Sequence, residues 1–322
     1  MNVLLVGGGI MGQRHLFGIL EEASSVTLVE PDQNAQKICY NIAHEKLGND
    51  FLTLNNLYDL GSGEIFDLAI LSGPASGRLE RFSWLLERGV NTMLVEKPLE
   101  QSRKKTRAFL SAAKSAKARV WTNHYRRNLA GFSELLALQQ PLTITVTSGA
   151  MGLGTNGIHW IDFSLYMTDQ SSGKLLFGEI DKLPIGSGRG SQYRDYGGRG
   201  LFAFPDGSRL YLSSVPSSSA PTVFTVITGH QHWVIDQFTD RTIVHQRPEG
   251  VKHPMYLYGK DYCSSVREDL EAVNLASHTR LFISALKQKM NPKFPTLEMV
   301  APTYELFFDL LETSGYNDFK FT

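Results

Sequence analysis

Short apolar and β-branched runs alternate with amphipathic segments through the first third of the chain. The apolar runs have the length of strands, and the segments between them repeat apolar residues at helical spacing, as Leu79, Phe82 and Leu86 do. This alternation predicts a parallel sheet covered by helices on both faces. The predicted strands are Asn2–Val6, Val26–Val29, Phe51–Leu54, Asp67–Leu71, Thr92–Val95 and Arg119–Asn123, and the predicted helices are Met11–Glu22, Asn34–Glu45, Arg78–Arg88 and Arg103–Lys117.

The pattern changes near Asn123, after which strand-like runs follow one another with fewer helical segments between them. Consecutive strands of this kind favour a largely antiparallel sheet. Between two of them, Asp206 and Gly207 supply the positive φ that a hairpin turn requires. The strands predicted in this half are Thr143–Thr147, Gly200–Phe204, Ser208–Ser214, Thr222–Thr228, His232–Gln237 and Arg241–Gln246.

Three amphipathic segments of the second half are predicted as helices. They are Gly157–Met167, a long segment from about Ser264 to Lys289, and Leu297–Leu311, which is interrupted by Pro302 because proline donates no helix hydrogen bond. The long segment is expected to bury one apolar stripe along its length. That stripe consists of Val266, Leu270, Val273, Leu281 and Ala285.

Composition narrows the class of protein. The chain has 322 residues, more than one hydrophobic core usually supports, so two domains are expected. Lys plus Arg and Asp plus Glu number 32 each, which gives no overall positive field for nucleic acid or an anionic membrane. Cys39 and Cys263 lie far apart and indicate neither a disulfide framework nor a metal site. Without a signal-peptide pattern or a membrane-length apolar run, the expected location is the cytoplasm.

A glycine-rich turn joins the first predicted strand to the first helix. Gly7, Gly9 and Gly12 form a GxGxxG pattern in the strand-turn-helix context that a dinucleotide-binding turn requires. Gly7 permits the tight turn, Gly9 lets the backbone approach a pyrophosphate, and Gly12 permits close packing of helix on strand. The helix start, at Ile10 and Met11, then presents its N–H groups to the phosphates. A turn without a ligand is the alternative.

The second predicted strand ends at Glu30, about 20 residues past the glycines, where a carboxylate binds the adenine ribose 2′-hydroxyl of NAD. The same carboxylate repels the 2′-phosphate of NADP, and the nearest base is Lys37 on the next helix, so NAD is predicted over NADP. The predicted fold class is therefore α/β. Residues 1–123 form a Rossmann doubly wound parallel sheet that binds NAD, and residues 124–322 form an α+β domain on a largely antiparallel open sheet that binds the substrate.

The fifth predicted strand runs into Glu96, Lys97 and Pro98 at the carboxyl edge of the sheet, where doubly wound folds bind their ligands. An ammonium group there can hydrogen-bond a reacting hydroxyl and stabilise alkoxide character. Ser72 and Pro74 follow the fourth strand at the same edge and, with Glu96 and Lys97, are predicted to border the cofactor. A surface lysine in an exit loop is the alternative for Lys97.

These motifs, with Gly157-Ile158-His159-Trp160-Ile161-Asp162, resemble the glucose-fructose oxidoreductase and inositol 2-dehydrogenase family. The resemblance covers most of the chain, and its most specific part is the glycine fingerprint followed by Glu-Lys-Pro at this separation. It implies a Rossmann domain and a mixed-sheet domain whose open sheet face makes the contacts of a homo-oligomer. It also implies that Lys97 and His159 flank the substrate carbon presented to the nicotinamide, His159 acting as acid and base.

The sequence departs from the family pattern at two positions. The family's acid four positions before the histidine falls on Thr155, with Asn156 beside it. Both can orient a substrate, but neither holds a negative charge or takes a proton, so acid/base work falls to His159 and Lys97. The family's histidine after the fourth strand is also absent. Arg78 lies nearby and is interpreted as a solvated helix-start residue, with a phosphate or carboxylate contact as the alternative.

Three further features are candidates for substrate contacts. Tyr125, Arg126 and Arg127 follow the last Rossmann strand, where the arginines are expected either to hold an anionic substrate group or to form ion pairs between domains. Residues 185–200, with arginines and tyrosines spaced through glycines, are predicted as a mobile loop, either a lid over the substrate or a plain connection. Asp162 is expected to stabilise its helix start or orient a side chain.

The leading hypothesis is an enzyme that transfers a hydride between NAD and a secondary alcohol or ketone of a sugar, amino sugar, cyclitol or nucleotide-linked sugar. A non-catalytic NAD-binding sensor or regulator on the same scaffold is the alternative, which the missing acid at Thr155 keeps open. An imine or enone reductase is a further alternative among enzymes. The residues expected to bind the substrate are Lys97, Tyr125, Arg126, Thr155, Asn156 and His159.

Overall fold

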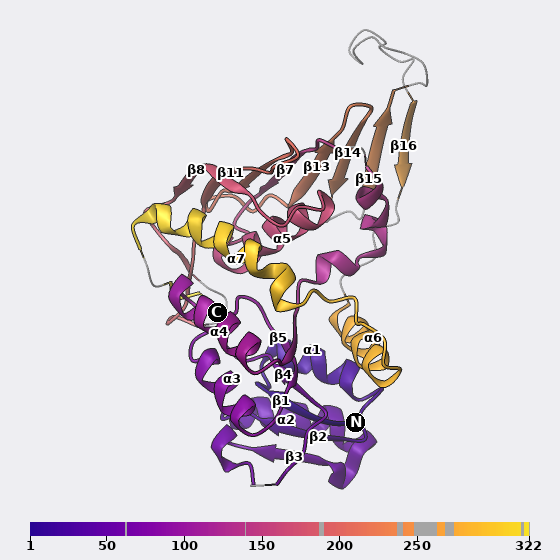
Figure 1. Cartoon of the computed structure of the whole chain (residues 1–322), viewed down its shortest axis with the longest axis vertical. Coiled ribbons are helices and arrows are strands. Elements are labelled where there is room, and N and C mark those ends of the chain that lie inside the picture. Colours follow the sequence, from indigo (N-terminus) through magenta and orange to yellow (C-terminus); the bar gives the residue numbers. More distant parts are fainter. Residues whose placement is uncertain are drawn as a thin grey trace. The chain divides into compact units, whose positions relative to one another are not determined.

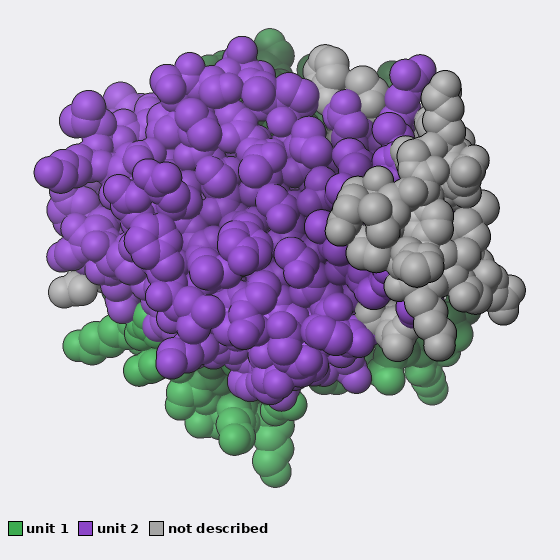
Figure 2. Space-filling model, turned by 90° about the horizontal axis from the view of Figure 1, so that it is seen from above, with its two compact units in different colours: residues 1–128, 273–301, 322 green, residues 129–272, 302–321 purple. Residues whose placement is uncertain are grey.

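A computed structural model describes residues 1–61, 63–138, 140–186, 190–236, 241–247, 263–267, 274–316 and 319–321. The chain divides into two compact units, drawn in different colours in Figure 2. The first consists mainly of Met1–Asn128 and Val273–Ala301, and the second of Leu129–Ala272 and Pro302–Phe321. The helix α7 (Leu297–Leu311) contains Pro302 as expected, and the division between the units falls at this proline.

The first unit is built on a six-stranded parallel sheet with the order β3-β2-β1-β4-β5-β6. The chain moves outward from β1 in both directions, so the predicted doubly wound topology is confirmed. In such sheets the ligand crevice lies at the carboxyl ends of the strands where the order reverses, here between β1 and β4. The strands are β1 (Asn2–Val6), β2 (Ser25–Val29), β3 (Phe51–Leu54), β4 (Leu68–Leu71), β5 (Thr92–Val95) and β6 (Arg119–Thr122).

Helices flank this sheet (Figure 1), with α1 packed against α2 and α6, and α3 packed against α4. The starts of three helices have side-chain caps: Asp32 accepts from two backbone N–H groups of α2, Ser102 accepts from one of α4, and Asn274 accepts from one of α6. The helices that lie wholly in this unit are α1 (Ile10–Ile19), α2 (Gln33–Leu47), α3 (Arg78–Glu87), α4 (Arg103–Ser115) and α6 (Leu275–Lys287).

The helix predicted from about Ser264 to Lys289 is wrong in its first part. Residues Cys263–Arg267 form strand β16, paired with β15, and α6 begins only at Leu275, where the Asn274 side chain accepts from Ser277 N. Cys263 and Val266 are three positions apart, which fits helical spacing, but pairing with β15 places these residues in a strand. Leu270 and Val273 lie outside the described residues. Leu281 is 59% exposed, so the predicted stripe is not the buried face of α6.

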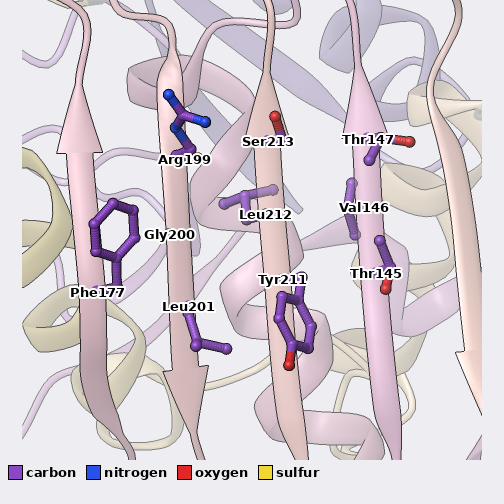
Figure 3. A pocket seen from close by; sticks show the side chains of 10 residues that line it. All are labelled: Thr145, Val146, Thr147, Phe177, Arg199, Gly200, Leu201, Tyr211, Leu212 and Ser213. Atoms are coloured by element: carbon purple, nitrogen blue, oxygen red, sulfur yellow. The ribbon is translucent and has the colours of Figure 1, made fainter.

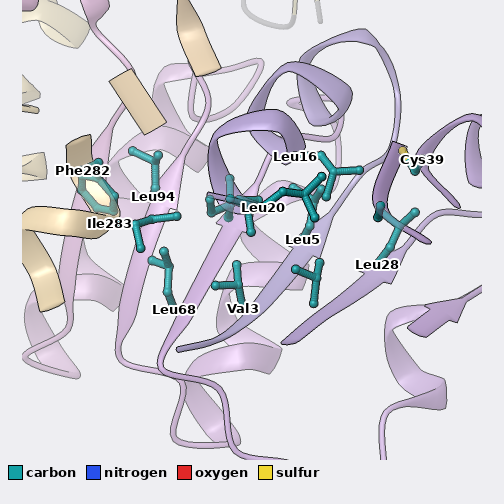
Figure 4. Packing of buried hydrophobic residues seen from close by; sticks show 14 of the residues in the cluster. Val3, Leu5, Leu16, Leu20, Leu28, Cys39, Leu68, Leu94, Phe282 and Ile283 are labelled. Atoms are coloured by element: carbon teal, nitrogen blue, oxygen red, sulfur yellow. The ribbon is translucent and has the colours of Figure 1, made fainter. Parts of the chain in front are cut away.

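The buried face of α6 completes the core of the first unit. Phe282 and Ile283 pack with side chains of β1, α1 and β5 such as Leu5, Leu16 and Leu94 (Figure 4). The helices α1 and α6 approach closely because Gly18 has no side chain. A Cβ at this position would lie 2.2 Å from the backbone oxygen of Ala276. Residues 273–301 therefore return to the first unit, a long-range packing that local patterns do not reveal.

The second unit is built on an eight-stranded, mostly antiparallel sheet with the order β16-β15-β14-β13-β7-β12-β11-β8, in which β7 and β12 pair in parallel. This confirms the predicted α+β sheet. At the hairpin between β11 and β12, Gly207 has φ +95 and Phe204 N donates to Ser208 O, as predicted. The strands are β7 (Thr143–Ser148), β8 (Lys174–Ile180), β11 (Gly198–Ala203), β12 (Arg209–Ser214), β13 (Val223–Ile227), β14 (Gln231–Asp236), β15 (Arg241–Gln246) and β16.

Helix α5 (Ile158–Met167) covers one face of this sheet, where the rings of Trp160 and Phe224 lie 5.0 Å apart. The segment 185–200 is not one long loop, because β9 (Ile185–Gly186) pairs with β10 (Arg194–Asp195) and β11 begins at Gly198. Its residues 187–189 lie outside the described part. Across the described ranges, no helix combines the length and apolar character that crossing a membrane requires.

Candidate active site

The turn after β1 is shaped by glycines that cannot be replaced without a clash. Gly7 has φ +104, and a Cβ on it would lie 2.5 Å from Gly73 N, while a Cβ on Gly12 would lie 2.0 Å from Gly7 O. The Ser72 hydroxyl donates to Gly7 O at 2.8 Å, so the end of β4 holds the turn. At Gly9, by contrast, no described atom lies within 4 Å of the Cβ position, which leaves room for a ligand.

The N-terminus of α1 opens beside this turn. Among the described residues no side chain caps it, and its first turn contains no acidic residue. Ile10 is 67% exposed and Met11 is half-buried, so the start of the helix borders solvent. An uncapped helix N-terminus attracts negative charge. The turn and the helix start therefore fit the pyrophosphate of a dinucleotide.

Glu30 lies directly after β2, with its carboxylate at the glycine turn. One carboxylate oxygen accepts from Gly8 N at 2.6 Å and the other accepts from Asp32 N at 2.9 Å. Because each oxygen can accept a second hydrogen bond, the carboxylate retains capacity for ribose hydroxyls. The contact to Gly8 was not predicted. Through this hydrogen bond, Glu30 also holds the glycine turn in place.

Glu96, the first residue of Glu-Lys-Pro, is buried and held by hydrogen bonds within the first unit. Its Oε1 accepts from His15 Nε2 at 2.9 Å and from Asn123 Nδ2 at 2.5 Å. Burial alone would raise the pKa of Glu96, but the hydrogen bond and charge of His15, the charge of Lys97 and the Asn123 amide together lower that pKa to about 2. Glu96 is therefore a carboxylate that anchors the turn, and a contact to the cofactor stays a prediction.

Both ring nitrogens of His15 have buried partners. Nδ1 lies 2.8 Å from the Thr279 hydroxyl, and that hydroxyl also lies 2.9 Å from Leu275 O. Nε2 lies 2.9 Å from the carboxylate of Glu96. The pair of His15 and Glu96 links α1, the turn after β5, and α6, and sequence patterns gave no signal for it.

Arg78 is not the solvated helix-start residue that the sequence suggested. It is 2% exposed, and its guanidinium donates to Glu96 O at 2.6 Å, to Gly73 O at 2.5 Å and to Pro98 O. A planar guanidinium with five donors can bridge several carbonyl oxygens at once, which a lysine cannot. Arg78 therefore ties the segment after β4 to the Glu-Lys-Pro turn, and Lys97 lies half-buried in that turn.

The remaining candidates of the first unit lie close to this edge in sequence. Pro74 is exposed, and its carbonyl accepts from Arg81 at 2.7 Å. Arg126 is buried, with its guanidinium 5.0 Å from the centre of the Tyr125 ring and donating to the Tyr125 hydroxyl. Burial lowers the pKa of Arg126. Anion binding stays a prediction for Arg126 and Arg127, and a cofactor contact stays a prediction for Pro74.

In the second unit, the π-helical turn Leu153–Gly157 leads into α5 and places Thr155 and Asn156 just before His159. The Asn156 amide donates to Met151 O at 2.5 Å and to the Thr155 hydroxyl at 3.3 Å. Thr155 donates in turn to Asp195, a carboxylate that was not predicted in the site. His159 is buried at the start of the helix.

Asp162 lies one turn beyond His159 and is fully buried. Its carboxylate accepts from the Thr303 hydroxyl at 3.1 Å, and Thr303 belongs to the part of α7 that follows Pro302. Of the two expected roles, this contact fits a carboxylate that orients a side chain. The hydrogen bond joins α5 to α7 within the second unit and thereby supports the helix that carries His159.

A doubly wound sheet with a glycine turn at the point where its order reverses, and a carboxylate after its second strand, defines a Rossmann-type dinucleotide-binding protein. Residues 1–124 match the Gfo/Idh/MocA family model, described as an oxidoreductase family with an NAD-binding Rossmann fold. Over these residues the chain matches the model of that family, which confirms the resemblance to glucose-fructose oxidoreductase and inositol 2-dehydrogenase. No curated protein sequence matches the chain.

Solved structures share the fold over nearly the whole chain. UDP-N-acetylglucosamine 3-dehydrogenase GnnA from Acidithiobacillus ferrooxidans is 13% identical, covers 96% of each chain and has a TM-score of 0.73. Levoglucosan dehydrogenase, in complex with NADH and levoglucosan, is 14% identical over 98% of this chain and 97% of its own, with a TM-score of 0.71. An oxidoreductase from Agrobacterium radiobacter, in complex with NAD+, L-tartaric acid and magnesium, is 10% identical over 98% and 96%, with a TM-score of 0.73.

Proposed function

We propose that the protein is an NAD-dependent oxidoreductase that acts on a secondary alcohol or ketone of a sugar, amino sugar, cyclitol or nucleotide-linked sugar. The observation that carries the proposal is the glycine turn, where Gly7 and Gly12 exclude side chains and Gly9 borders open space, beside the carboxylate of Glu30. The similarly folded UDP-N-acetylglucosamine 3-dehydrogenase and levoglucosan dehydrogenase support the sugar-like class of substrate.

Lys97 and His159 carry the chemistry in this proposal. Bound NAD supplies the hydride acceptor or donor. Lys97, which follows β5 at the carboxyl edge of the sheet, holds the reacting oxygen and stabilises the negative charge that develops on it. His159 takes or returns the hydroxyl proton. The proposed substrate contacts are Lys97, Tyr125, Arg126, Thr155, Asn156 and His159, and the proposed cofactor contacts are Gly7, Gly9, Ile10, Met11, Gly12, Glu30, Ser72, Pro74, Glu96 and Lys97.

NAD is proposed over NADP because a carboxylate, Glu30, lies where the adenine ribose is bound in Rossmann folds. A 2′-phosphate at this position would meet a like charge, whereas ribose hydroxyls can donate to the carboxylate. Both oxygens of Glu30 are already held by Gly8 and Asp32, so its orientation is fixed before a ligand binds. Titration with both cofactors tests this preference, and tighter binding of NADPH contradicts it.

A homo-oligomer is proposed through the outer face of the second unit's sheet, opposite α5. Figure 3 shows side chains of four neighbouring strands on this face, around a cavity of about 290 Å³. Phe177 and Tyr211 are 52% and 46% exposed there, and Leu201 lies between their strands. Large exposed apolar side chains grouped on one face are typical of a protein interface.

A substrate screen with NAD tests the function directly. Thermal-shift measurements of sugars, sugar acids and nucleotide sugars in the presence of NAD identify ligands without assuming turnover. NADH formation or consumption with the hits is then measured for the wild type, Lys97→Ala and His159→Ala. Loss of turnover in both variants is expected, and full turnover in both contradicts the assigned roles. If NAD binds but no hit reacts, the sensor or regulator function replaces the enzymatic one.

A further inference from the structure

A buried carboxylate from the glycine-rich segment holds the turn before the His159 helix. Asp195 belongs to β10 and is 7% exposed. Its Oδ1 accepts from Gly154 N and from Tyr196 N, both at 2.8 Å, and its Oδ2 accepts from the Thr155 hydroxyl. Asp195 therefore caps the turn Leu153–Gly157 from a segment 40 residues further along the chain.

The backbone around Asp195 is built to receive this carboxylate. Gly152 has φ +74, and a Cβ on it would lie 2.1 Å from Asp195 Oδ2, so only glycine fits at that position. Two backbone hydrogen bonds fix the strand that carries the carboxylate: Leu153 N donates to Tyr196 O at 2.8 Å, and Arg194 N donates to Lys320 O at 2.9 Å. The backbone is therefore hydrogen-bonded on both sides of Asp195, at Arg194 and at Tyr196.

The hydrogen bond between Thr155 and Asp195 sets the direction of the threonine hydroxyl. Asp195, as a carboxylate, only accepts, so the hydroxyl hydrogen of Thr155 is committed to it. Thr155 can then meet a ligand only as an acceptor. Asn156 is oriented in the same network, because its amide donates to Thr155 and to Met151 O. A hydroxyl group of a substrate is the ligand that such an acceptor recognises.

We propose that Asp195 is a positioning residue of the substrate site, which fixes Thr155 as a hydrogen-bond acceptor for a substrate hydroxyl and orients the turn that leads to His159. The inference rests on the proposed function. It assigns the negative charge that Thr155 lacks to Asp195 on β10, and it gives the described part of segment 185–200 a role in holding the site. No proton transfer by Asp195 is required, because it acts through Thr155.

A double-mutant cycle with Asp195→Asn and Thr155→Val tests the coupling. An asparagine can still accept from Gly154 N through its oxygen, but its amide donates toward Thr155 and reverses the hydroxyl. On a sugar found by the screen, each single variant is expected to lower kcat/KM at least tenfold, chiefly through KM. The kcat/KM of the double variant is expected to be no lower than that of the less active single variant. Multiplicative losses, or an Asp195→Asn enzyme with unchanged KM, contradict the proposal.

A control variant and a measurement without substrate complete the test. Asp206→Asn is the matched control, because Asp206 also accepts a backbone N–H and a hydroxyl, both from Ser208, in the hairpin between β11 and β12. Its kinetics are expected to equal those of the wild type. In Asp195→Ala, amide exchange at Gly154 is expected to accelerate at least tenfold, and unchanged exchange overturns the positioning role. If the wild type oxidises or reduces no sugar, the proposed function fails, while this exchange still decides whether Asp195 holds the turn.

Discussion

Replacing Glu96 by glutamine removes the charge of the buried pair with His15 while preserving the shape of the side chain. His15 is fully buried and Glu96 is 4% exposed, so water does not replace the lost carboxylate without movement of α1 or α6. Removing one partner of a buried ion pair typically costs about 3 to 5 kcal/mol, because the other charge is left uncompensated. Glu96→Gln is therefore expected to be strongly destabilising.

The pKa of Glu96 gives an independent magnitude. Each pKa unit corresponds to about 1.36 kcal/mol, so lowering the pKa from 4.5 to about 2 stabilises the folded protein by about 3 kcal/mol. Since the folded-state pKa is the lower one, this stabilisation is present in full above pH 4.5 and is lost as the pH falls toward 2. The difference between wild type and Glu96→Gln is expected to shrink over the same range.

Urea unfolding at pH 7 and at pH 3.5 measures both effects. Glu21→Gln is the control, because Glu21 and Lys46 also form a 2.9 Å ion pair, but with both side chains about half exposed. Solvent screens such a pair, so no measurable change in the free energy of unfolding is expected for the control. If Glu96→Gln unfolds at the same urea concentration as wild type at pH 7, the buried ion pair does not stabilise the fold and the reasoning is refuted.

Three further predictions concern the cofactor turn, the Glu-Lys-Pro turn and the sheet face. Gly9→Ala is expected to keep the wild-type melting temperature but weaken NADH binding at least tenfold in a fluorescence titration, since its Cβ meets only the space assigned to the ligand. Arg78→Met is expected to lower the melting temperature by several degrees, because three carbonyl oxygens, two of them in buried hydrogen bonds, lose their donor. Tyr211→Asp is expected to dissociate the oligomer in sedimentation velocity without altering the far-UV spectrum, and an unchanged sedimentation coefficient contradicts the interface.

Local patterns predicted the first unit well because its strands are short apolar runs bounded by turn residues. The glycine turn and Glu30 were predictable for the same reason, since both lie within one strand-turn-helix unit and the strand after it. Arg78 was misjudged because its partners, Glu96 O and Pro98 O, are backbone atoms that become neighbours only when β4 and β5 pair. A sequence carries no local signal for such contacts.

The second half was harder to predict because its decisive contacts span long stretches of chain. α6 belongs to the first unit's core through Phe282 and Ile283, although nearly half of the chain separates it from β6. The sequence showed that Thr155 stands where the family has an acid. It did not show that Asp195 contacts Thr155, because Asp195 lies in a segment that was interpreted as a loop. Its role becomes visible only when β10 is placed beside the turn Leu153–Gly157.

The most direct test of the central claim is a titration of the purified protein with NADH and NADPH, followed by nicotinamide fluorescence, on the wild type and Glu30→Ala. The proposal predicts saturable binding of NADH that is at least tenfold tighter than that of NADPH. It also predicts that this preference is lost when the Glu30 carboxylate is removed. Absence of binding by either cofactor, or a preference for NADPH in the wild type, would contradict it.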